Sequence, residues 1–267
     1  MESTGVYHLR LAMYLYDHGI RVSVLNPLSV KNFSRATLCR TKTDKSDSRL
    51  LVDYARRMPC RLWQPTPDHY TRIQQLYRVM AQLQGHLSDI RNQQEALSFS
   101  PVCDTALRTF LRRHSSSVQR KIDVILHRIE TLLSQVDSES VERIVSVPGV
   151  GRKTAIALLT ATKGLNGFSN YRALSSYLGL APRTYQSGSS VNGKAHICKM
   201  GMGWIRKLLY LCAVCACRCN PICRSMYERL RQRGKPAKVA LIAVANKLLK
   251  IICALNNKKQ RFNPNFI

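Results

Sequence analysis

Apolar residues recur every three or four positions over long stretches of this chain, a spacing that places them on one face of a helix. Between residues 66 and 140 the pattern runs in two arms, separated by a break over 98–103 that contains Pro101. The apolar positions of the two arms are Ile73, Leu76, Met80, Leu83 and Leu87, then Val124, Ile125, Ile129, Leu132 and Leu133. This pattern predicts an antiparallel helical hairpin or coiled coil.

From about residue 139 onward, helical stretches alternate with Gly-rich turns. Helices are predicted near residues 139–146, 152–162, 170–178, 202–219, 222–232 and 236–256. The most apolar stretch, 239–255, contains Lys247 and Lys250, which argue against a membrane span and favour a buried or half-buried helix. Residues 180–199 are polar and rich in Gly and Ser, so a loop is predicted there.

The first part of the chain mixes both periodicities. Helices are predicted over 8–18 and 47–57, and the alternating, β-branched segment 21–25 is predicted to be a strand closed by Asn26 and Pro27. A single strand cannot form a sheet, so this one is expected to lack partners. The expected fold is mainly α with an α/β remnant, organised as an N-terminal domain over 1–65, a helical spacer over 66–140 and an α-helical C-terminal domain over 141–267.

The charge is strongly positive and unevenly placed. Lys and Arg total 42 against 15 Asp and Glu, a net charge of +27. Residues 1–65 carry 11 basic and 5 acidic residues (+6), residues 66–140 carry 9 and 8 (+1), and residues 141–267 carry 22 and 2 (+20). A polyanion is the natural partner of such a surface, and nucleic acid is the commonest one. The first ten residues lack the charged-then-apolar pattern of a leader, and reduced cysteines in a cytoplasm are expected.

Three carboxylates near the start of the chain are candidate metal ligands. Cleavage of a phosphodiester with two divalent ions requires several converging carboxylates. Asp44 and Asp47 are three residues apart and would share one face of a helix, and Glu2 is the third candidate. The alternative is structural, with Thr43 or Asp44 serving as the N-cap of that helix.

The sequence Pro148-Gly149-Val150-Gly151 lies between two predicted helices and is typical of a helix-hairpin-helix. Glycines there would let backbone N–H groups approach a phosphate at a helix N-terminus, flanked by Arg152 and Lys153. The alternative is an ordinary turn between helices.

A Gly-rich segment carries serines among basic residues. One serine in 185–190 could attack phosphorus, because Arg183, Lys194 and Lys199 would stabilise the developing charge. The alternative is a polar loop without chemistry.

Five cysteines cluster in the C-terminal domain, at positions Cys212, Cys215, Cys217, Cys219 and Cys223. No CxxC pair is matched by a second pair, as zinc sites usually require. These cysteines are therefore interpreted as small buried hydrophobic residues.

Eight segments, in order, resemble the DEDD insertion-sequence transposases of the IS110 family. The resembling segments are 2–8 (ESTGVYH), 24–27 (VLNP), 42–47 (KTDKSD), 148–151 (PGVG), 179–182 (GLAP), 187–188 (SG), 197–201 (ICKMG) and 243–249 (AVANKLL). The resemblance extends over essentially the whole chain.

This resemblance implies a RuvC-like, RNase H-like domain, a helical spacer and a C-terminal domain that carries a serine. It assigns Glu2, Asp44 and Asp47 to three of four carboxylates of a two-metal Mg²⁺ site. It assigns Ser187 to the serine that attacks DNA and holds it covalently, with Ser189 and Ser190 as alternatives. It also implies a structured bridge RNA that reads sequence by base pairing while the protein reads shape and backbone.

One departure from the family pattern concerns its first Asp, which lies on an opening strand upstream of the Glu. Here Glu2 follows Met1 directly. The expectation is a truncated partial domain that lacks this Asp and the first strands, with impaired catalysis, weak metal binding and retained nucleic-acid binding.

The leading functional hypothesis is a transposase or DNA recombinase of an insertion sequence, cytoplasmic and nucleoid-associated, that acts as a homo-oligomer without a membrane. Metal-bound carboxylates and Ser187 would cooperate in cleaving and joining DNA strands. The main alternative is a non-catalytic DNA-binding protein that uses the helix-hairpin-helix and the basic C-terminal region. A third reading, a RuvC-type junction resolvase, fits the serine loop and the TDKSD segment less well.

Overall fold

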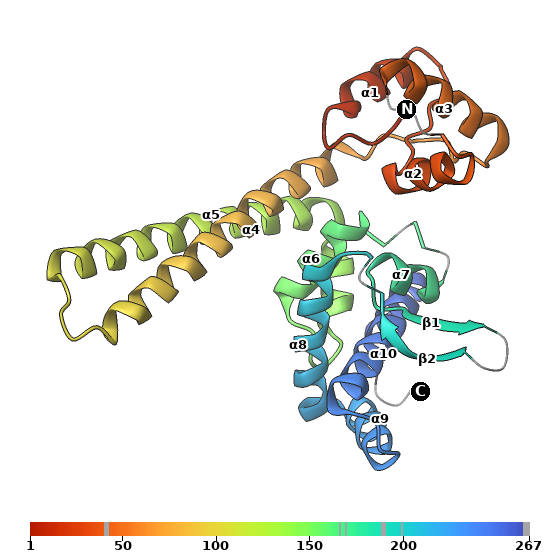
Figure 1. Cartoon of the computed structure of the whole chain (residues 1–267). Coiled ribbons are helices and arrows are strands. Elements are labelled where there is room, and N and C mark those ends of the chain that lie inside the picture. The colour runs from red at the N-terminus through yellow and green to blue at the C-terminus, as the bar shows by residue number, and fades with distance from the viewer. Residues whose placement is uncertain (40–42, 166, 169, 188–190, 199, 264–267) are drawn as a thin grey trace. The chain divides into compact units, whose positions relative to one another are not determined.

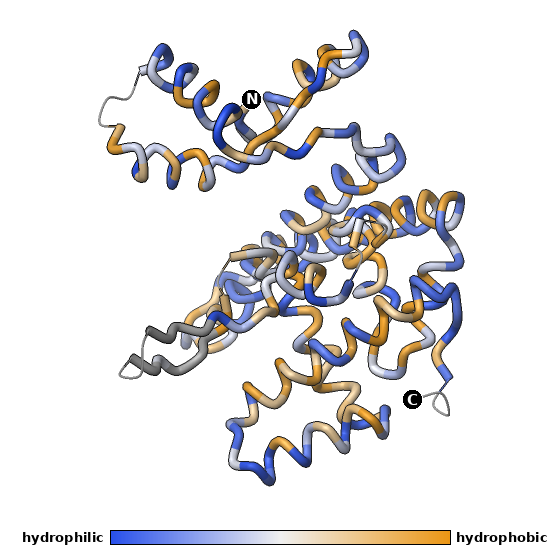
Figure 2. Tube along the Cα trace, turned by 90° about the vertical axis from the view of Figure 1, so that its right-hand side faces the viewer, coloured by the Kyte–Doolittle hydropathy of each residue, from blue (hydrophilic) through white to orange (hydrophobic). Residues whose placement is uncertain are grey.

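A computed structural model describes residues 1–39, 43–165, 167–168, 170–187, 191–198 and 200–263. The chain divides into two compact units, Met1–Pro67 and Asp68–Ile267. Helices dominate both units, which confirms the expectation of a mainly α protein (Figure 1). Along most helices hydrophilic and hydrophobic residues alternate with the turn of the helix, as amphipathic packing requires (Figure 2).

The described residues of the first unit form three helices, α1 (His8–Asp17), α2 (Pro27–Ala36) and α3 (Asp44–Arg57). Extended segments precede and follow α1, and Glu2 and Leu25 form a parallel β-bridge. Ser3 N–H donates to the Leu25 carbonyl at 2.9 Å, and Leu25 N–H donates to the Met1 carbonyl at 2.9 Å. The same segment has a second partner, because Trp63 N–H donates to the Val22 carbonyl at 2.7 Å. Segment 21–25 is thus an extended segment with one β-bridge and not the predicted regular strand, and the expectation that it lacks partners was also wrong.

The helix α2 was not predicted, because Asn26 and Pro27 were interpreted only as the end of a strand. Asn26 is instead the N-cap: its side chain accepts a hydrogen bond from Leu28 N–H at 2.9 Å, and Pro27 occupies the first helical position. The capping alternative for α3 is confirmed. Thr43 Oγ1 accepts from Ser46 N–H at 3.1 Å while Ser46 Oγ accepts from Thr43 N–H at 2.8 Å, a complete capping box.

The second unit begins with the predicted helical hairpin, formed by α4 (Asp68–Ser98) and α5 (Thr105–Val145) (Figure 1). Its seam buries the expected residues Ile73, Met80, Leu87, Ile129 and Leu133. The 41-residue span of α5 is interrupted at Asp137, which has non-helical φ and ψ of −154° and 50°. This break agrees with the prediction of a separate helix near residues 139–146.

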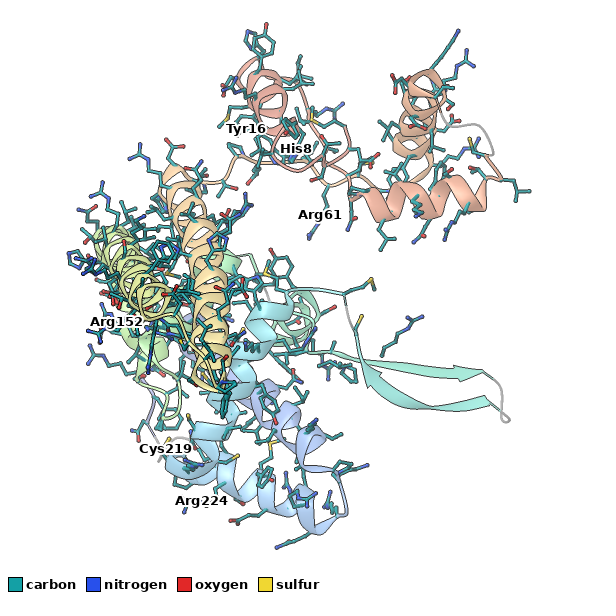
Figure 3. All side chains as sticks on the ribbon, turned by 60° about the vertical axis from the view of Figure 1, so that its left-hand side comes forward. His8, Tyr16, Arg61, Arg152, Cys219 and Arg224 are labelled. Atoms are coloured by element: carbon teal, nitrogen blue, oxygen red, sulfur yellow. The ribbon has the colours of Figure 1, made fainter. Side chains whose placement is uncertain are left out.

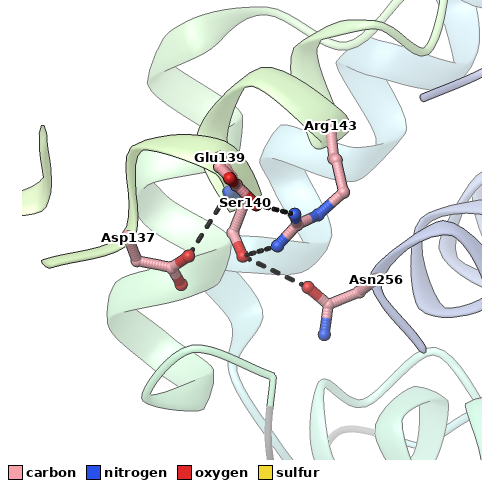
Figure 4. A network of polar contacts seen from close by, with 5 residues as sticks. All are labelled: Asp137, Glu139, Ser140, Arg143 and Asn256. Atoms are coloured by element: carbon pink, nitrogen blue, oxygen red, sulfur yellow. Dashed lines mark hydrogen bonds and ion pairs between the residues drawn. The ribbon is translucent and has the colours of Figure 1, made fainter. Parts of the chain in front are cut away.

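Polar contacts hold the segment after this break (Figure 4). Asp137 Oδ1 accepts from Ser140 N–H at 3.3 Å, and Ser140 Oγ donates to Asn256 Oδ1 at 3.3 Å. Arg143 donates to Ser140 Oγ at 2.6 Å and pairs with Glu139 at 2.9 Å. The end of α5 is therefore tied to the C-terminal helix across 116 residues of sequence.

A helical body completes this unit. Its elements are α6 (Arg152–Thr162), α7 (Tyr171–Tyr177), α8 (Gly203–Cys219), α9 (Pro221–Gln232) and α10 (Ala237–Lys258). All five helices were predicted. By length and composition α10 could cross a membrane, but it packs against α5, α7, α8 and α9. It buries Val244, Leu248, Leu249 and Ile252 completely, as expected for a core helix.

A β-hairpin projects from this body, formed by β1 (Pro182–Ser187) and β2 (Val191–Ile197), which pair antiparallel (Figure 1). The prediction of a loop over 180–199 was wrong for these residues. Their sequence is too polar to show a strand's apolar alternation, because the hairpin is not embedded in the core.

The cysteine interpretation is partly correct. Cys212 and Cys223 are buried, but Cys215 and Cys219 are exposed. Cys219 and Arg224 lie where α8 meets α9 (Figure 3). Arg224 donates hydrogen bonds to the carbonyls of Cys217 and Arg218, and so caps the end of α8.

Candidate functional site

The β-hairpin that carries Ser187 is fastened to the body at its base by Arg206 of α8. The Arg206 Nη1 atom donates to the Gly179 carbonyl at 3.0 Å and to the Cys198 carbonyl at 3.2 Å. Gly179 precedes β1 and Cys198 follows β2, so one half-buried guanidinium joins both arms. Hydrogen bonds from a charged donor are stronger than those from a neutral one.

Asn246 of α10 provides a second attachment. Its side-chain N–H donates to the Leu180 carbonyl at 3.1 Å and to the Ile242 carbonyl at 3.3 Å. Its Oδ1 accepts from the buried Ser175 hydroxyl at 2.6 Å. The start of the hairpin is thereby held against the core helix α10 and against α7.

Two glycines allow the segment before β1 and the segment after β2 to approach each other closely. Gly179 and Gly201 have φ values of +76° and +98°. A Cβ on Gly179 would lie 2.5 Å from the Met200 carbonyl oxygen, and one on Gly201 would lie 2.7 Å from the Gly179 nitrogen. The Gly-rich character of this segment therefore has a packing cause at these two positions.

Ser187 is the last residue of β1 and is in register with Val191 across the turn. Arg183 lies near the start of the same strand, opposite His196, and is exposed. The backbone of Lys194 belongs to β2. Lys199, Ser189 and Ser190 lie outside the described residues. The serine is thus placed at the end of the projecting hairpin, away from its anchored base.

The turn between α5 and α6 carries the predicted phosphate-binding residues. Gly149 has a φ of +96°, and a Cβ there would lie 2.6 Å from both Cα and Cβ of Ala216 in α8. Packing against α8 therefore accounts for this glycine. Gly151 is the N-cap of α6, and a Cβ on it would meet open space.

The two cations of this turn differ in their surroundings. Arg152 pairs with Glu130 at 3.3 Å and with Glu142 at 3.2 Å, both on α5. Lys153 is exposed. The two glutamates partly neutralise the charge of Arg152, so Arg152 is less available to a phosphate than Lys153.

The candidate carboxylates all lie in the first unit. Glu2 is half-buried on the bridged segment, Asp44 is exposed at the first position of α3, and Asp47 is half-buried one turn later. Three carboxylates are a donor set that suits Mg²⁺. Yet in the described part of the chain no group of three or more His, Cys, Asp or Glu side chains lies close enough to hold a metal ion. In the single chain, these three residues therefore do not come together as a metal site.

Sequence reasoning missed the positioning residues. Nothing in the sequence marks Arg206 as a positioning residue, because it is one of several cations on a predicted helix. Its partners are backbone carbonyls up to 27 residues away, which no sequence pattern indicates. Asn246 offered a weak signal, because an amide in the apolar helix 236–256 requires hydrogen-bond partners when it is covered.

Comparison with known proteins gives two matching family models. The transposase IS116/IS110/IS902 family matches residues 141–228, and a transposase model of the DEDD IS110 type matches residues 1–98. The chain is 32% identical to the pilin gene-inverting protein of Moraxella bovis over 98% of this chain and 81% of that protein. The corresponding protein of Moraxella lacunata is 31% identical over the same shares.

A transposase of the insertion sequence element IS1328 from Yersinia enterocolitica is 25% identical, covering 94% of this chain and 81% of the relative. The matches extend over both units, and transposases act on DNA. The chain belongs to the IS110 family of insertion-sequence transposases.

Proposed function

We propose that this chain is a DNA recombinase that cleaves and rejoins strands at the ends of an insertion sequence, with the Ser187 hydroxyl as the attacking group. The observation that carries the proposal is the anchored hairpin. Arg206 and Asn246 fasten its base to buried helices, and Ser187 stands at its outer end. A serine on an anchored projection can be presented to a bulky substrate such as a DNA strand.

The proposed step conserves the energy of the phosphodiester. The Ser187 oxygen forms a bond to phosphorus, the bond from phosphorus to a deoxyribose oxygen breaks, and the hydroxyl proton goes to that leaving oxygen. A strand hydroxyl then reverses the step and rejoins DNA. Arg183, Lys194 and Lys199 are proposed to hold the phosphate, since cations stabilise the charge that develops on its oxygens. Similarity to the pilin gene-inverting proteins is consistent with such cutting and joining.

DEDD transposases use divalent metal ions, and we propose Glu2, Asp44 and Asp47 as the acidic residues of that site, with Mg²⁺ as the ion. Their oxygen donors support the proposal, whereas their separation in the single chain does not. We therefore assign no catalytic step to the ion. An assembly of several chains and a structured bridge RNA are proposed as partners.

The proposed domains follow the charge and the folding pattern. Residues 1–65 would form a RuvC-like domain, and the parallel bridge of Glu2 and Leu25 around α1 supports this because parallel pairing needs such a crossover. Residues 66–140 would be the spacer. Residues 141–267 would be the catalytic C-terminal domain, with a helix-hairpin-helix whose turn contains Pro148-Gly149-Val150-Gly151.

The alternative is a DNA-binding protein without catalysis, favoured by the separation of the three carboxylates. Covalent protein–DNA adducts distinguish the two functions. The full chain is expressed in cells that carry its gene with the flanking DNA, the cells are lysed in SDS, and DNA linked to protein is captured and sequenced. Ser187→Ala should reduce adducts to background and leave the affinity for duplex DNA within about twofold.

Ser189→Ala and Ser190→Ala are the matched controls, and both should retain the adduct. Loss of the adduct in one of these variants, with retention in Ser187→Ala, would transfer the assignment to that serine. A wild-type chain that binds duplex DNA but yields no adduct would support the non-catalytic alternative.

A further inference from the structure

A cavity of about 690 Å³ opens between α4, α6, α7 and α8, on the body of the second unit. Its volume is within the range of about 300–1,000 Å³ that is usual for sites that take a small organic group. Its lining includes no residue of the serine hairpin and none of the turn at 146–151.

Aromatic side chains form part of its wall. Tyr77 of α4 and Trp204 of α8 are in contact, with ring centroids 4.9 Å apart and planes tilted by 35°. Trp204 remains 41% exposed, an unusual exposure for the largest apolar side chain. Tyr177 also lines the cavity and is fixed by its hydroxyl, which donates to the Ala161 carbonyl at 3.3 Å. Aromatic faces are therefore held in place and open to a ligand.

The charged side chains of the lining are all cationic among the described residues. Arg78, Lys163 and Lys207 line the cavity, and none of the described residues that line it is acidic. Thr160 also lines it; this residue is 3% exposed, and its hydroxyl has no hydrogen-bond partner in the described part of the chain. A buried hydroxyl without a partner is costly, but this oxygen lies beneath the cavity surface, so the cations and the aromatic rings carry the argument.

We propose that this cavity binds one unpaired nucleotide of a single-stranded nucleic acid, with its base stacked on Trp204 and its phosphate held by Lys207 and Arg78. Stacked aromatic rings beside cations are the usual means of binding single strands without reading their sequence. A base inside a duplex is covered on both faces by its neighbours, so a concave aromatic site selects an unpaired one. The inference rests on the proposed function, because strand cleavage and a bridge RNA both supply unpaired nucleotides.

The chain contains two tryptophans, Trp63 and Trp204, so Trp63→Phe leaves Trp204 as the single tryptophan reporter. In this background, oligonucleotides of one sequence are titrated as single-stranded DNA, as single-stranded RNA and as a DNA duplex. Single strands should quench Trp204 fluorescence at concentrations at least tenfold below those needed by the duplex. The two single-stranded arms show whether DNA or RNA is preferred.

Affinity is then measured by anisotropy of a labelled single strand. Trp204→Leu should weaken binding about tenfold, as expected for the loss of one stacking platform. Lys207→Gln, which changes an exposed residue, should weaken it severalfold. Lys121→Gln on α5 is the charge-matched control and should have little effect. Equal quenching by duplex and single strands, or unchanged affinity in Lys207→Gln and in a folded Trp204→Leu, would overturn the proposal.

The outcome is separable from that of the catalytic proposal. Ser187→Ala in the Trp63→Phe background should show the same quenching by single strands. Quenching without covalent adducts would count against the serine chemistry alone, and adducts without quenching would count against the nucleotide site alone.

Discussion

Replacement of Gly149 by alanine tests whether this glycine serves packing or phosphate binding. In the structure an added Cβ would lie 2.6 Å from Ala216 Cα and Cβ, and the backbone φ of +96° is one that L side chains rarely adopt. Backbone strain of this kind costs about 1–2 kcal/mol, and overpacking a core costs about 1–3 kcal/mol. Gly149→Ala should therefore destabilise the second unit by about 2–5 kcal/mol.

Gly151→Ala is the matched control, two residues away in the same turn. Gly151 has an ordinary φ of −85°, and its added Cβ would meet open space. Alanine is a poorer N-cap than glycine but restricts the unfolded chain, so the two effects offset to within about 1 kcal/mol. Gly149→Ala and Gly151→Ala each remove one glycine from the proposed phosphate site, but only Gly149→Ala is expected to lower the stability of the fold. The two variants therefore separate packing from phosphate binding.

Urea unfolding of the full chain is followed by Trp204 fluorescence in the Trp63→Phe background, because Trp204 lies on α8 and reports on the second unit. With a urea dependence of about 3 kcal/mol per M, Gly149→Ala should lower the midpoint by about 1 M and Gly151→Ala by much less. Equal midpoints in the two variants would refute the packing argument. If Gly149→Ala also lost DNA affinity while folded, the phosphate role would be supported instead.

Three further changes test other contacts. Arg206→Met removes both hydrogen bonds to the base of the serine hairpin, so protease cleavage within 182–197 should accelerate about tenfold and covalent adducts should decrease; an unchanged cleavage rate would contradict the anchoring role. Lys153→Gln should weaken duplex DNA binding more than Arg152→Gln, whose cation already pairs with two glutamates; equal losses in gel-shift titrations would contradict this. Burial raises the pKa of Cys223 to about 11 and that of Tyr77 to about 12. The folded state therefore holds the protons of Cys223 and Tyr77 more tightly than the unfolded state does. Their contribution to the free energy of unfolding is complete below about pH 9 and is lost as pH rises through 11–12. Urea midpoints should therefore be lower at pH 10.5 than at pH 8.

The helices of the second unit could be predicted because their apolar faces are buried in one core, and burial imposes the helical period on the sequence. The β-hairpin could not, because what holds it is remote: Arg206 follows β2, and Asn246 lies about 50 residues beyond the hairpin. Such contacts leave no periodic pattern in the strands themselves. The missed helix α2 is a different case, since Asn26-Pro27 is a valid start signal that was interpreted as a stop.

In the candidate site too, local sequence spacing was predictable and contacts between remote segments were not. Residue types and spacing identified Asp44 and Asp47, and their shared helical face was predictable from the three-residue interval. The distance from these carboxylates to Glu2 was not, because it depends on how an extended segment and a helix pack. Gly149 shows the opposite case. The sequence suggested that this glycine lets backbone N–H groups approach a phosphate, whereas the structure shows that it is required by the close contact with Ala216.

The distribution of charge favours the C-terminal part as the main DNA-binding surface. Residues 141–267 carry 22 cations and two acidic residues, and one of these, Glu142, already pairs with Arg152. The other, Glu228, is exposed on α9 and cannot balance the remaining cations. A surface of this kind releases many condensed counterions when it binds a duplex, so affinity should fall steeply with salt. The spacer at 66–140, with a net charge of +1, should contribute little to that slope. Charge reversal at several exposed α10 lysines should therefore reduce the salt dependence, whereas the same number of reversals on α5 should not.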